Sequence, residues 1–460
     1  MSVLSGQAAS VPAASAWRRV FAADEYDVVS YITAYLFLLM FIPSSLIFAP
    51  LGGSGNPALV YSLLISLWYI TFWMIGKTTF SGGGKPVRIA VLIFALAILA
   101  SFVASMTRDI SQVEALAAYR GLIELAAWAG LVIVVSQSVS SYSRLDTLLR
   151  RAVIFGSIVA GIGIFEYYSG LNVTNLLRLP GLTENSTYST LLNRDGLNRP
   201  SSTAVDPIEF GVVMAMLLPL ALQQAIARSR PGSISRWVPV ALIAFAIPMS
   251  VSRSAILAAP IGCIIVVSAW RARQRHTFYV FFALGLIALK AVTHSLIGTL
   301  LNYFAGMFGG GDGSVATRTD DYARDWPYVV QRPLFGRGFG TFLPQLYSWT
   351  DNMYLNSLIE TGIFGLLSLL LLYLAGIHCA AAGRRRTQDE ERRGLGQALV
   401  ASIVVAAIGS ATFDALDFPM LAGILFLLLG AAGAYLAIMT RDGTSFPVLR
   451  VRSPMDRTGI

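Results

Sequence analysis

The stretch FAIPMSVSRSAILAAPIGCIIV (residues 245–266) places a single charged residue, Arg253, between two apolar tracts. Each transmembrane helix needs about 20 predominantly apolar residues. The chain therefore predicts an all-α polytopic membrane protein with about twelve transmembrane helices. The tracts beside Arg253 are short and could form one kinked unit, but their combined length favours two crossings. The apolar tracts lie at about 30–48, 57–76, 88–106, 116–137, 152–169, 205–227, 237–250, 255–270, 277–298, 353–382, 397–414 and 419–439.

The composition agrees with a membrane protein and disfavours a nucleic-acid-binding protein, a disulfide-linked protein and a zinc protein. Hydrophobic residues make up 55% of the chain, charged residues only 13%, and the mean hydropathy is +0.65, whereas soluble domains are about 25% charged. The net charge of +9 does not indicate nucleic-acid binding, because the basic residues form short clusters between apolar tracts. Cys263 and Cys379 both lie in apolar tracts and the three histidines are scattered, so neither a disulfide nor a zinc site is predicted.

The distribution of charge predicts the orientation. An even number of crossings puts both termini on one side, and most of the 34 lysines and arginines then fall on that side. Basic residues mark the cytoplasmic side of short loops. We therefore expect a cytoplasmic N-terminal tail (1–26), a transmembrane domain (27–440) and a cytoplasmic C-terminal tail (441–460). Arg253 is then on the outer side, where the rule does not expect a basic residue.

Two long segments are predicted on the outer side, at about 170–204 and 299–352. Connections of this length are usually functional or disordered. The second segment is rich in aromatic residues, so we expect it to be ordered. It is predicted to contain a short helix around 317–331, preceded by the glycine cluster at 309–313.

Arginines on the outer side suggest an anionic ligand at the membrane surface. A guanidinium group binds phosphate oxygens through two parallel hydrogen bonds and stays charged at any working pH. A lipid-linked diphosphate would lie at this depth. Simpler interpretations also remain open: Arg253 could extend to the interface from a helix end, and Arg318 and Arg324 could pair with neighbouring aspartates on a loop helix.

Acidic residues supply further candidates. Asp351 and Asn352 precede the apolar tract 353–374 and could cap a helix; Asp351 could also act as a general base. These two roles are compatible. Glu360 is expected to be structural, whereas Glu166 lies within a predicted span with no partner evident from the sequence.

Four stretches together carry a family resemblance: NRPSSTAVDPIEFGVVMAMLLPLAL (198–222), SVSRSAIL (250–257), RPLFGRGFGTF (332–342) and DNMYLNSLIETGIFGL (351–366). In order and spacing they resemble the O-antigen ligase and polymerase superfamily, which comprises bacterial membrane glycosyltransferases. The resemblance covers about the C-terminal two thirds of the chain. The superfamily uses glycans linked to a polyprenyl diphosphate as donors.

This resemblance implies a helical fold similar to the GT-C glycosyltransferases and inverting glycosyl transfer at the outer face of the bacterial cytoplasmic (inner) membrane. The implied donor is a glycan on undecaprenyl diphosphate, and the acceptor is another lipid-linked glycan or lipid A-core. No cofactor, metal or nucleic acid is expected. Asp351 and Arg253 would be catalytic. The implied substrate-binding residues are Arg199, Arg253, Arg318, Arg324, Arg337 and Asn352.

One departure from the family pattern bears on the reaction. Ligases of the superfamily carry a histidine where this chain has Asp351. An aspartate with an unperturbed pKa of about 3.9 is a weaker base, and the change favours a polymerase that builds O-antigen or exopolysaccharide. The alternatives are a ligase, a transporter of polysaccharide intermediates and a non-catalytic scaffold. No internal repeat is evident, which weakens the transporter interpretation.

Overall fold

The computed structural model describes residues 28–75, 84–177, 179–185, 191–194, 196–227, 234–292 and 313–444. The predicted N-terminal tail and residues 445–460 of the predicted C-terminal tail lie outside these residues. The longer helices are α2 (Val28–Phe41), α3 (Pro57–Met74), α4 (Lys85–Met106), α5 (Gln112–Ser138), α6 (Tyr142–Ser169), α7 (Pro207–Ala227), α8 (Val238–Met249), α9 (Arg253–Ser268), α10 (Ala272–Val292), α12 (Gly313–Gln331), α13 (Met353–Arg385), α14 (Glu390–Ser410) and α15 (Pro419–Thr444).

Short elements complete the described chain. Two antiparallel pairs of strands lie in the first outer segment and its surroundings, β1 with β2 and β3 with β4. Their bounds and those of the 3-10 helices are β1 (Leu46–Ile47), η1 (Ala49–Gly55), η2 (Val173–Leu176), β2 (Thr183–Glu184), β3 (Leu192–Arg194), β4 (Leu197–Arg199), η3 (Ile234–Trp237) and η4 (Ala415–Asp417).

The predicted all-α membrane architecture is confirmed. Among the described residues, eight helices are long and apolar enough to cross a membrane: α3, α4, α5, α6, α7, α13, α14 and α15. Helices α2, α8 and α9 are apolar but shorter. Each predicted tract overlaps one helix. The first tract was predicted too long, because α2 ends at Phe41, two residues before Pro43, and a proline disfavours helical geometry in the residue that precedes it.

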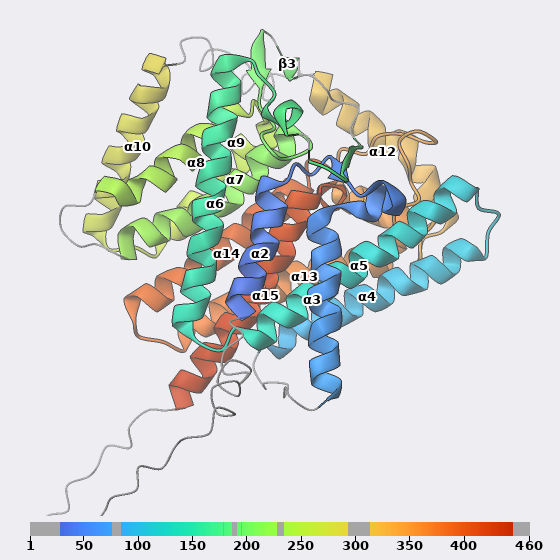
Figure 1. Cartoon of the computed structure of the whole chain (residues 1–460), viewed down its shortest axis with the longest axis horizontal. Helices are drawn as coiled ribbons and strands as arrows, with labels where there is room; N and C mark the ends of the chain where they lie inside the picture. The colour runs from blue at the N-terminus through green and yellow to red at the C-terminus, as the bar shows by residue number, and fades with distance from the viewer. Residues whose placement is uncertain are drawn as a thin grey trace, which may run out of the picture.

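The core of the bundle is built around α15. Every residue in its most apolar window is buried, and the neighbouring α7 is also largely buried. In Figure 1 the red helix α15 passes through the middle of the bundle, and it contacts α2, α4, α5, α6, α7, α13 and α14. A helix that is apolar on all sides is stable only when other elements surround it, which explains why the C-terminal tract lies innermost.

Helix α13 is broken at Gly362, where the backbone adopts φ 66°. The glycine-rich loop 333–342 fills this break. The amide of Ile363 donates to the Pro333 carbonyl at 2.9 Å, and the amide of Gly338 donates to the Glu360 carbonyl at 2.8 Å. The loop therefore takes up main-chain groups that the interrupted helix leaves without helical partners.

Close approach explains the glycines at this junction. A Cβ atom at Gly336 would lie 2.2 Å from the Glu360 carbonyl oxygen, and one at Gly362 would lie 2.3 Å from the Leu334 carbonyl oxygen. Both glycines also have positive φ. The run GRGFG thus has a structural role in which the loop and the broken helix fit together without side chains between them.

We expect Gly362→Ala to destabilise the protein by about 2–5 kcal/mol, because it adds both an unfavourable left-handed backbone and a clash with the loop. The thermal unfolding midpoint in detergent measures this. Gly161→Ala is the matched control, since Gly161 lies within α6 and a Cβ there meets nothing within 4 Å. Equal midpoints for the two variants would contradict the interlocked junction.

Candidate active site

The first outer segment is anchored at both ends by Glu166, a fully buried residue near the end of α6. Its carboxylate accepts a hydrogen bond from the amide of Val173 at 2.9 Å and another from the amide of Ser202 at 2.8 Å. The Ser202 hydroxyl also donates to the Val159 carbonyl at 3.0 Å. The partners that the sequence left open for Glu166 are therefore backbone amides, which fix where the segment leaves and rejoins the bundle.

Glu166→Ala is expected to loosen this segment, because two buried amides lose their acceptor at a cost of about 1–3 kcal/mol each. The rate of limited proteolysis between residues 170 and 204 should rise. Glu184→Ala serves as the control, since Glu184 is exposed on β2. Unchanged cleavage in Glu166→Ala would show that other contacts hold the segment.

Strand β4 brings Arg199 to the turn between α8 and α9. Leu197 of β4 packs in one buried cluster with Met249 and Val251, the residues on either side of Ser250 in that turn. Side chains two apart on a strand leave the same face, so Arg199 follows Leu197 toward the turn. The Asn198 side chain fixes the strand by donating to the Tyr167 carbonyl at 3.0 Å.

The α8–α9 turn has an unusual backbone and carries Arg253. Val251 adopts φ +48°, which is uncommon for a β-branched residue. Ser252 then caps α9 by accepting a hydrogen bond from the Ala255 amide at 3.4 Å, so Arg253 is the first residue of the helix. Gly211 of α7 lets the turn approach closely, because a Cβ there would lie 2.4 Å from the Ser250 hydroxyl. The turn therefore rests on the first turns of α7.

Asp206 caps α7 at this same end, where its carboxylate accepts from the Ile208 amide at 2.7 Å. Burial raises the pKa of Asp206, the positive charge of Arg199 opposes that rise, and the negative charge of Asp351 adds to it. Charges influence a pKa in this way only when they lie nearby. The structure therefore brings Arg199, Asp206 and Asp351 together, although they come from different outer segments.

Helix α7 is tied to the central helix by Glu209, which is fully buried. Its carboxylate accepts from the amides of Val205 and Met420 at 2.7 Å each and from that of Leu421 at 3.2 Å. The last two amides belong to the first turn of α15, where helical backbone donors lack partners. Glu209 thus fixes the α7 end that carries Asp206 against the core.

Asp351 and Asn352 form the start of α13, as predicted. The side-chain oxygen of Asn352 accepts a hydrogen bond from the backbone amide of Tyr354 at 2.9 Å and from that of Leu355 at 3.4 Å. The side-chain nitrogen of Asn352 donates to the Tyr322 hydroxyl at 2.6 Å. Asn352 is therefore the helix cap and also joins α12 to α13. Asp351, one residue earlier, is exposed.

Comparison with known proteins bears directly on this arrangement. Residues 238–370 match the family model described as O-Antigen ligase. The match covers less than a third of the chain, and over these residues the chain is similar to that family. The matched region runs from α8 into the first half of α13, so it includes Arg253 and Asp351, whereas Arg199 and Asp206 precede it.

A solved structure described as "Structural coordination of polymerization and crosslinking by a peptidoglycan synthase complex" aligns with 78% of this chain and 98% of its own, at a TM-score of 0.38 and 15% identity. No curated protein matches the chain.

Within the matched region, Arg324 on α12 forms a pair with its neighbour. Its guanidinium donates to both carboxylate oxygens of Asp325 at 3.0 Å and to the Trp349 carbonyl at 3.1 Å. Asp325 is fully buried and also accepts from the Ser348 hydroxyl at 2.9 Å. Local pairing is thus confirmed for Arg324. Arg318 lies on the same helix, but its side chain falls outside the described part of the structure.

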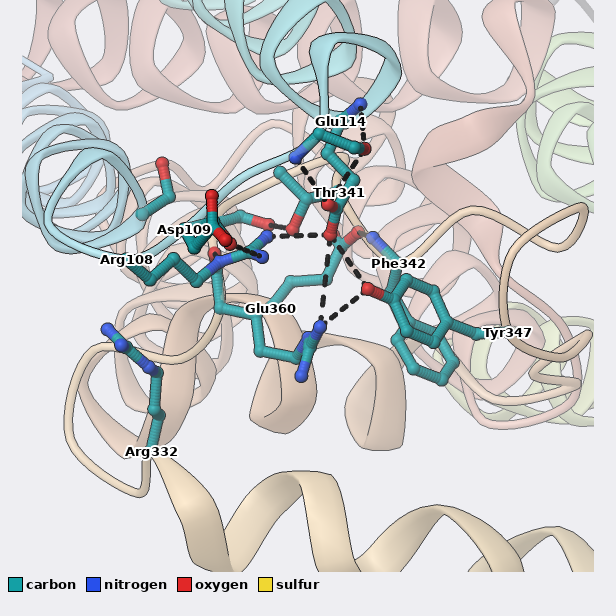
Figure 2. A network of polar contacts seen from close by, with 12 residues as sticks. Arg108, Asp109, Glu114, Arg332, Thr341, Phe342, Tyr347 and Glu360 are labelled. Atoms are coloured by element: carbon teal, nitrogen blue, oxygen red, sulfur yellow. Dashed lines mark hydrogen bonds and ion pairs between the residues drawn. The ribbon is translucent and has the colours of Figure 1, made fainter.

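Arg337 of the matched region lies in a different network. Its guanidinium donates to the Tyr347 hydroxyl at 2.6 Å, stacks 4.7 Å from the centre of that ring, and lies 3.8 Å from the Glu114 carboxylate. Figure 2 shows Arg108, Glu114 and Tyr347 meeting in this network, where Arg108 pairs with Glu114 at 2.8 Å. Arg337 therefore ties the loop to the start of α5, and the structure gives it no contact with Arg199, Asp206 or Asp351.

A buried polar cluster lies at the α14–α15 junction, outside the matched region. The Asp414 carboxylate accepts from the Asn356 side chain, and Arg120 pairs with Glu124 at 2.8 Å beside a cavity of about 30 Å³ that Asp417 also lines. Burial raises the pKa of both Asp414 and Asp417. In the described ranges, no three His, Cys, Asp or Glu side chains are arranged to hold a metal ion.

Sequence reasoning assigned neither Asp206 nor Tyr322 to the site. Asp206 could have been found from its local pattern, because an aspartate before a proline, with Glu209 three residues on, is a helix-start signal. Tyr322 had no such signal, since its link to Asn352 joins two elements through a tertiary contact.

Proposed function

We propose that the protein polymerises lipid-diphosphate-linked oligosaccharide repeat units into O-antigen or exopolysaccharide at the outer face of the bacterial cytoplasmic membrane. One observation carries the proposal: β4 packs against the α8–α9 turn that carries Arg253, and Arg199 of β4 lies near Asp206 and Asp351. The match of residues 238–370 to the family described as O-Antigen ligase supports glycosyl transfer as the reaction class.

In the proposed reaction the two arginines bind the donor diphosphate. The acceptor hydroxyl oxygen attacks the anomeric carbon of the donor, the bond from that carbon to the phosphate oxygen breaks, and lipid diphosphate leaves with the electron pair. Negative charge grows on the leaving oxygen, and fixed positive groups stabilise it in the transition state. Arg253 and Arg199 supply those groups, and Arg318 and Arg324 on α12 are proposed to assist.

Asp351 is proposed to accept the hydroxyl proton. Its exposure at the start of α13 leaves it open to an acceptor sugar. Asp206 lies nearby, and the negative charge of Asp351 adds to the rise that burial causes in the pKa of Asp206. Asn352 and Arg337 are proposed to position the α13 start and the loop.

Ligation is the second candidate. The matched family is described as O-Antigen ligase, and a ligase would transfer the finished glycan to lipid A-core. Aspartate at position 351, where ligases that the chain resembles carry histidine, favours polymerisation instead. Both reactions share the donor, the leaving group and the proposed roles of Arg199 and Arg253, so the acceptor alone distinguishes them.

The test uses purified protein in liposomes, supplied with a lipid-diphosphate-linked repeat unit alone. A ladder of lengthening glycans on a gel is the expected result, and the Arg253→Ala protein under the same conditions is the control. Transfer that begins only after lipid A-core is added would establish a ligase. Absence of product with both acceptors, from folded protein and authentic donor, would overturn the proposed enzyme activity.

A further inference from the structure

Helix α12 presents an exposed apolar face. Tyr322, Trp326 and Val330 are 47%, 51% and 62% exposed. They are spaced four residues apart, so they lie above one another on one side of the helix. Exposed aromatic and branched side chains in such a row are not expected to face water.

The other sides of α12 have different surroundings. Its buried side chain Val329 packs against Phe342 and Ile359, so this side faces the protein. Arg324 and Gln331 are exposed on the side away from the apolar row. The helix thus has a protein-facing side, a polar side and an apolar side that no described residue covers.

The length of α13 fixes the depth of this face. About 20 residues cross the hydrocarbon, and the part of α13 that follows Gly362 already has that length and ends in Arg384 and Arg385. The outer interface therefore lies near Gly362. Phe364, just past the break, is 48% exposed and stacks on Phe335 at 5.3 Å between ring centres.

Helix α4 gives the same depth independently. Its 22 residues begin at Lys85, so its outer end lies at the opposite interface. Arg332, which follows α12 directly, donates to the Ala104 carbonyl near that end at 3.2 Å. Val103 beside it is exposed. Two membrane-spanning helices therefore place the end of α12 at the level of the outer interface.

We propose that α12 lies in the outer membrane–water interface, with Tyr322, Trp326 and Val330 inserted among the lipids. Leu334 and Phe335 continue this face to the exposed apolar side chains of α13. In Figure 1, α12 runs across the direction of α15 at the edge of the bundle. An amphipathic helix with aromatic residues on its apolar side is typical of an interfacial helix.

The occupant of the face is the bilayer because the apolar surface is continuous with the exposed sides of α4 and α13, which the membrane covers. A protein partner would have to displace lipid from the same surface. This position of α12 does not depend on which reaction the protein performs. It also places the polar side that carries Arg324 at the depth of lipid phosphates.

Spin labels test the placement. Trp326→Cys and Val330→Cys, with Gln331→Cys as the matched control on the polar side, are labelled in a chain whose two native cysteines are replaced by alanine. In proteoliposomes the ratio of collisions with oxygen, which concentrates in lipid, to collisions with a water-soluble nickel chelate is measured. We expect this ratio to be several-fold higher at 326 and 330 than at 331.

Equal ratios at the three positions would place α12 in water and overturn the proposal. Shielding of positions 326 and 330 from both reagents would mean that a protein or a second copy covers the face, and would overturn it too. A second measurement needs no cysteine change: vesicles with brominated acyl chains should quench a fluorescence component that Trp326→Phe removes. Unchanged quenching in that variant would equally contradict interfacial burial.

Discussion

Arg253→Ala is expected to lower glycosyl transfer by about 10²–10³-fold, the size of effect seen when one group that stabilises transition-state charge is removed. The loss should appear in kcat at saturating donor, because negative charge on the diphosphate grows as the bond breaks. The measurement is the initial rate of glycan lengthening in proteoliposomes. Arg253 begins α9 and is only half-buried, so the variant should fold normally.

Two companions sharpen this experiment. Arg253→Lys keeps the charge but loses the paired hydrogen bonds of a guanidinium, and we expect it to recover only part of the rate. Arg332→Ala removes an arginine that donates to the Ala104 carbonyl of α4, and it should retain the wild-type rate. Wild-type turnover in folded Arg253→Ala would leave this arginine as an interfacial side chain without a catalytic role.

Asp351→Asn is expected to reduce transfer by about 10²–10⁴-fold, the usual contribution of a positioned general base. The amide keeps the size and the helix-start preference of aspartate, so the change isolates the proton acceptor. The measurement is the initial rate of glycan lengthening in proteoliposomes.

Asp109→Asn provides the matched control, because Asp109 is an exposed outer aspartate between α4 and α5. It should behave as wild type. If Asp351→Asn did so as well, residue 351 would be part of a helix start only, and Asp206 would become the better candidate for the base. Asp206→Asn would then be the variant that lowers the transfer rate.

Much of the fold followed from local sequence. Apolar tracts predict the helices because the bilayer demands a minimum apolar length, and the helix in the second outer segment was correctly expected after its glycine cluster. The error at α2 is also local, because the predicted tract extended past Pro43. The break in α13 was not predicted. It depends on a loop some twenty residues earlier that supplies main-chain partners to Gly362 and its neighbours.

The site was harder to predict than the helices. Arg199 and Arg337 both lie in outer segments and look alike in sequence, yet one approaches Asp206 and the other stacks on Tyr347. Only tertiary packing separates them. The hydrogen-bond partners of Glu166 and Glu209 could not be predicted either, because these partners are backbone amides, which every residue type except proline has.

The junction between the glycine-rich loop and α13 has a consequence for mutational tolerance. Its hydrogen bonds join main chain to main chain, and such bonds do not depend on which side chains flank them. Replacements at the exposed Leu334 should therefore keep the loop seated, whereas any added side-chain atom at Gly336 or Gly362 would push it out. In a saturation library across 333–342 and 359–364, the glycines with positive φ (Gly336, Gly338, Gly340 and Gly362) should reject the substitutions that Leu334 accepts.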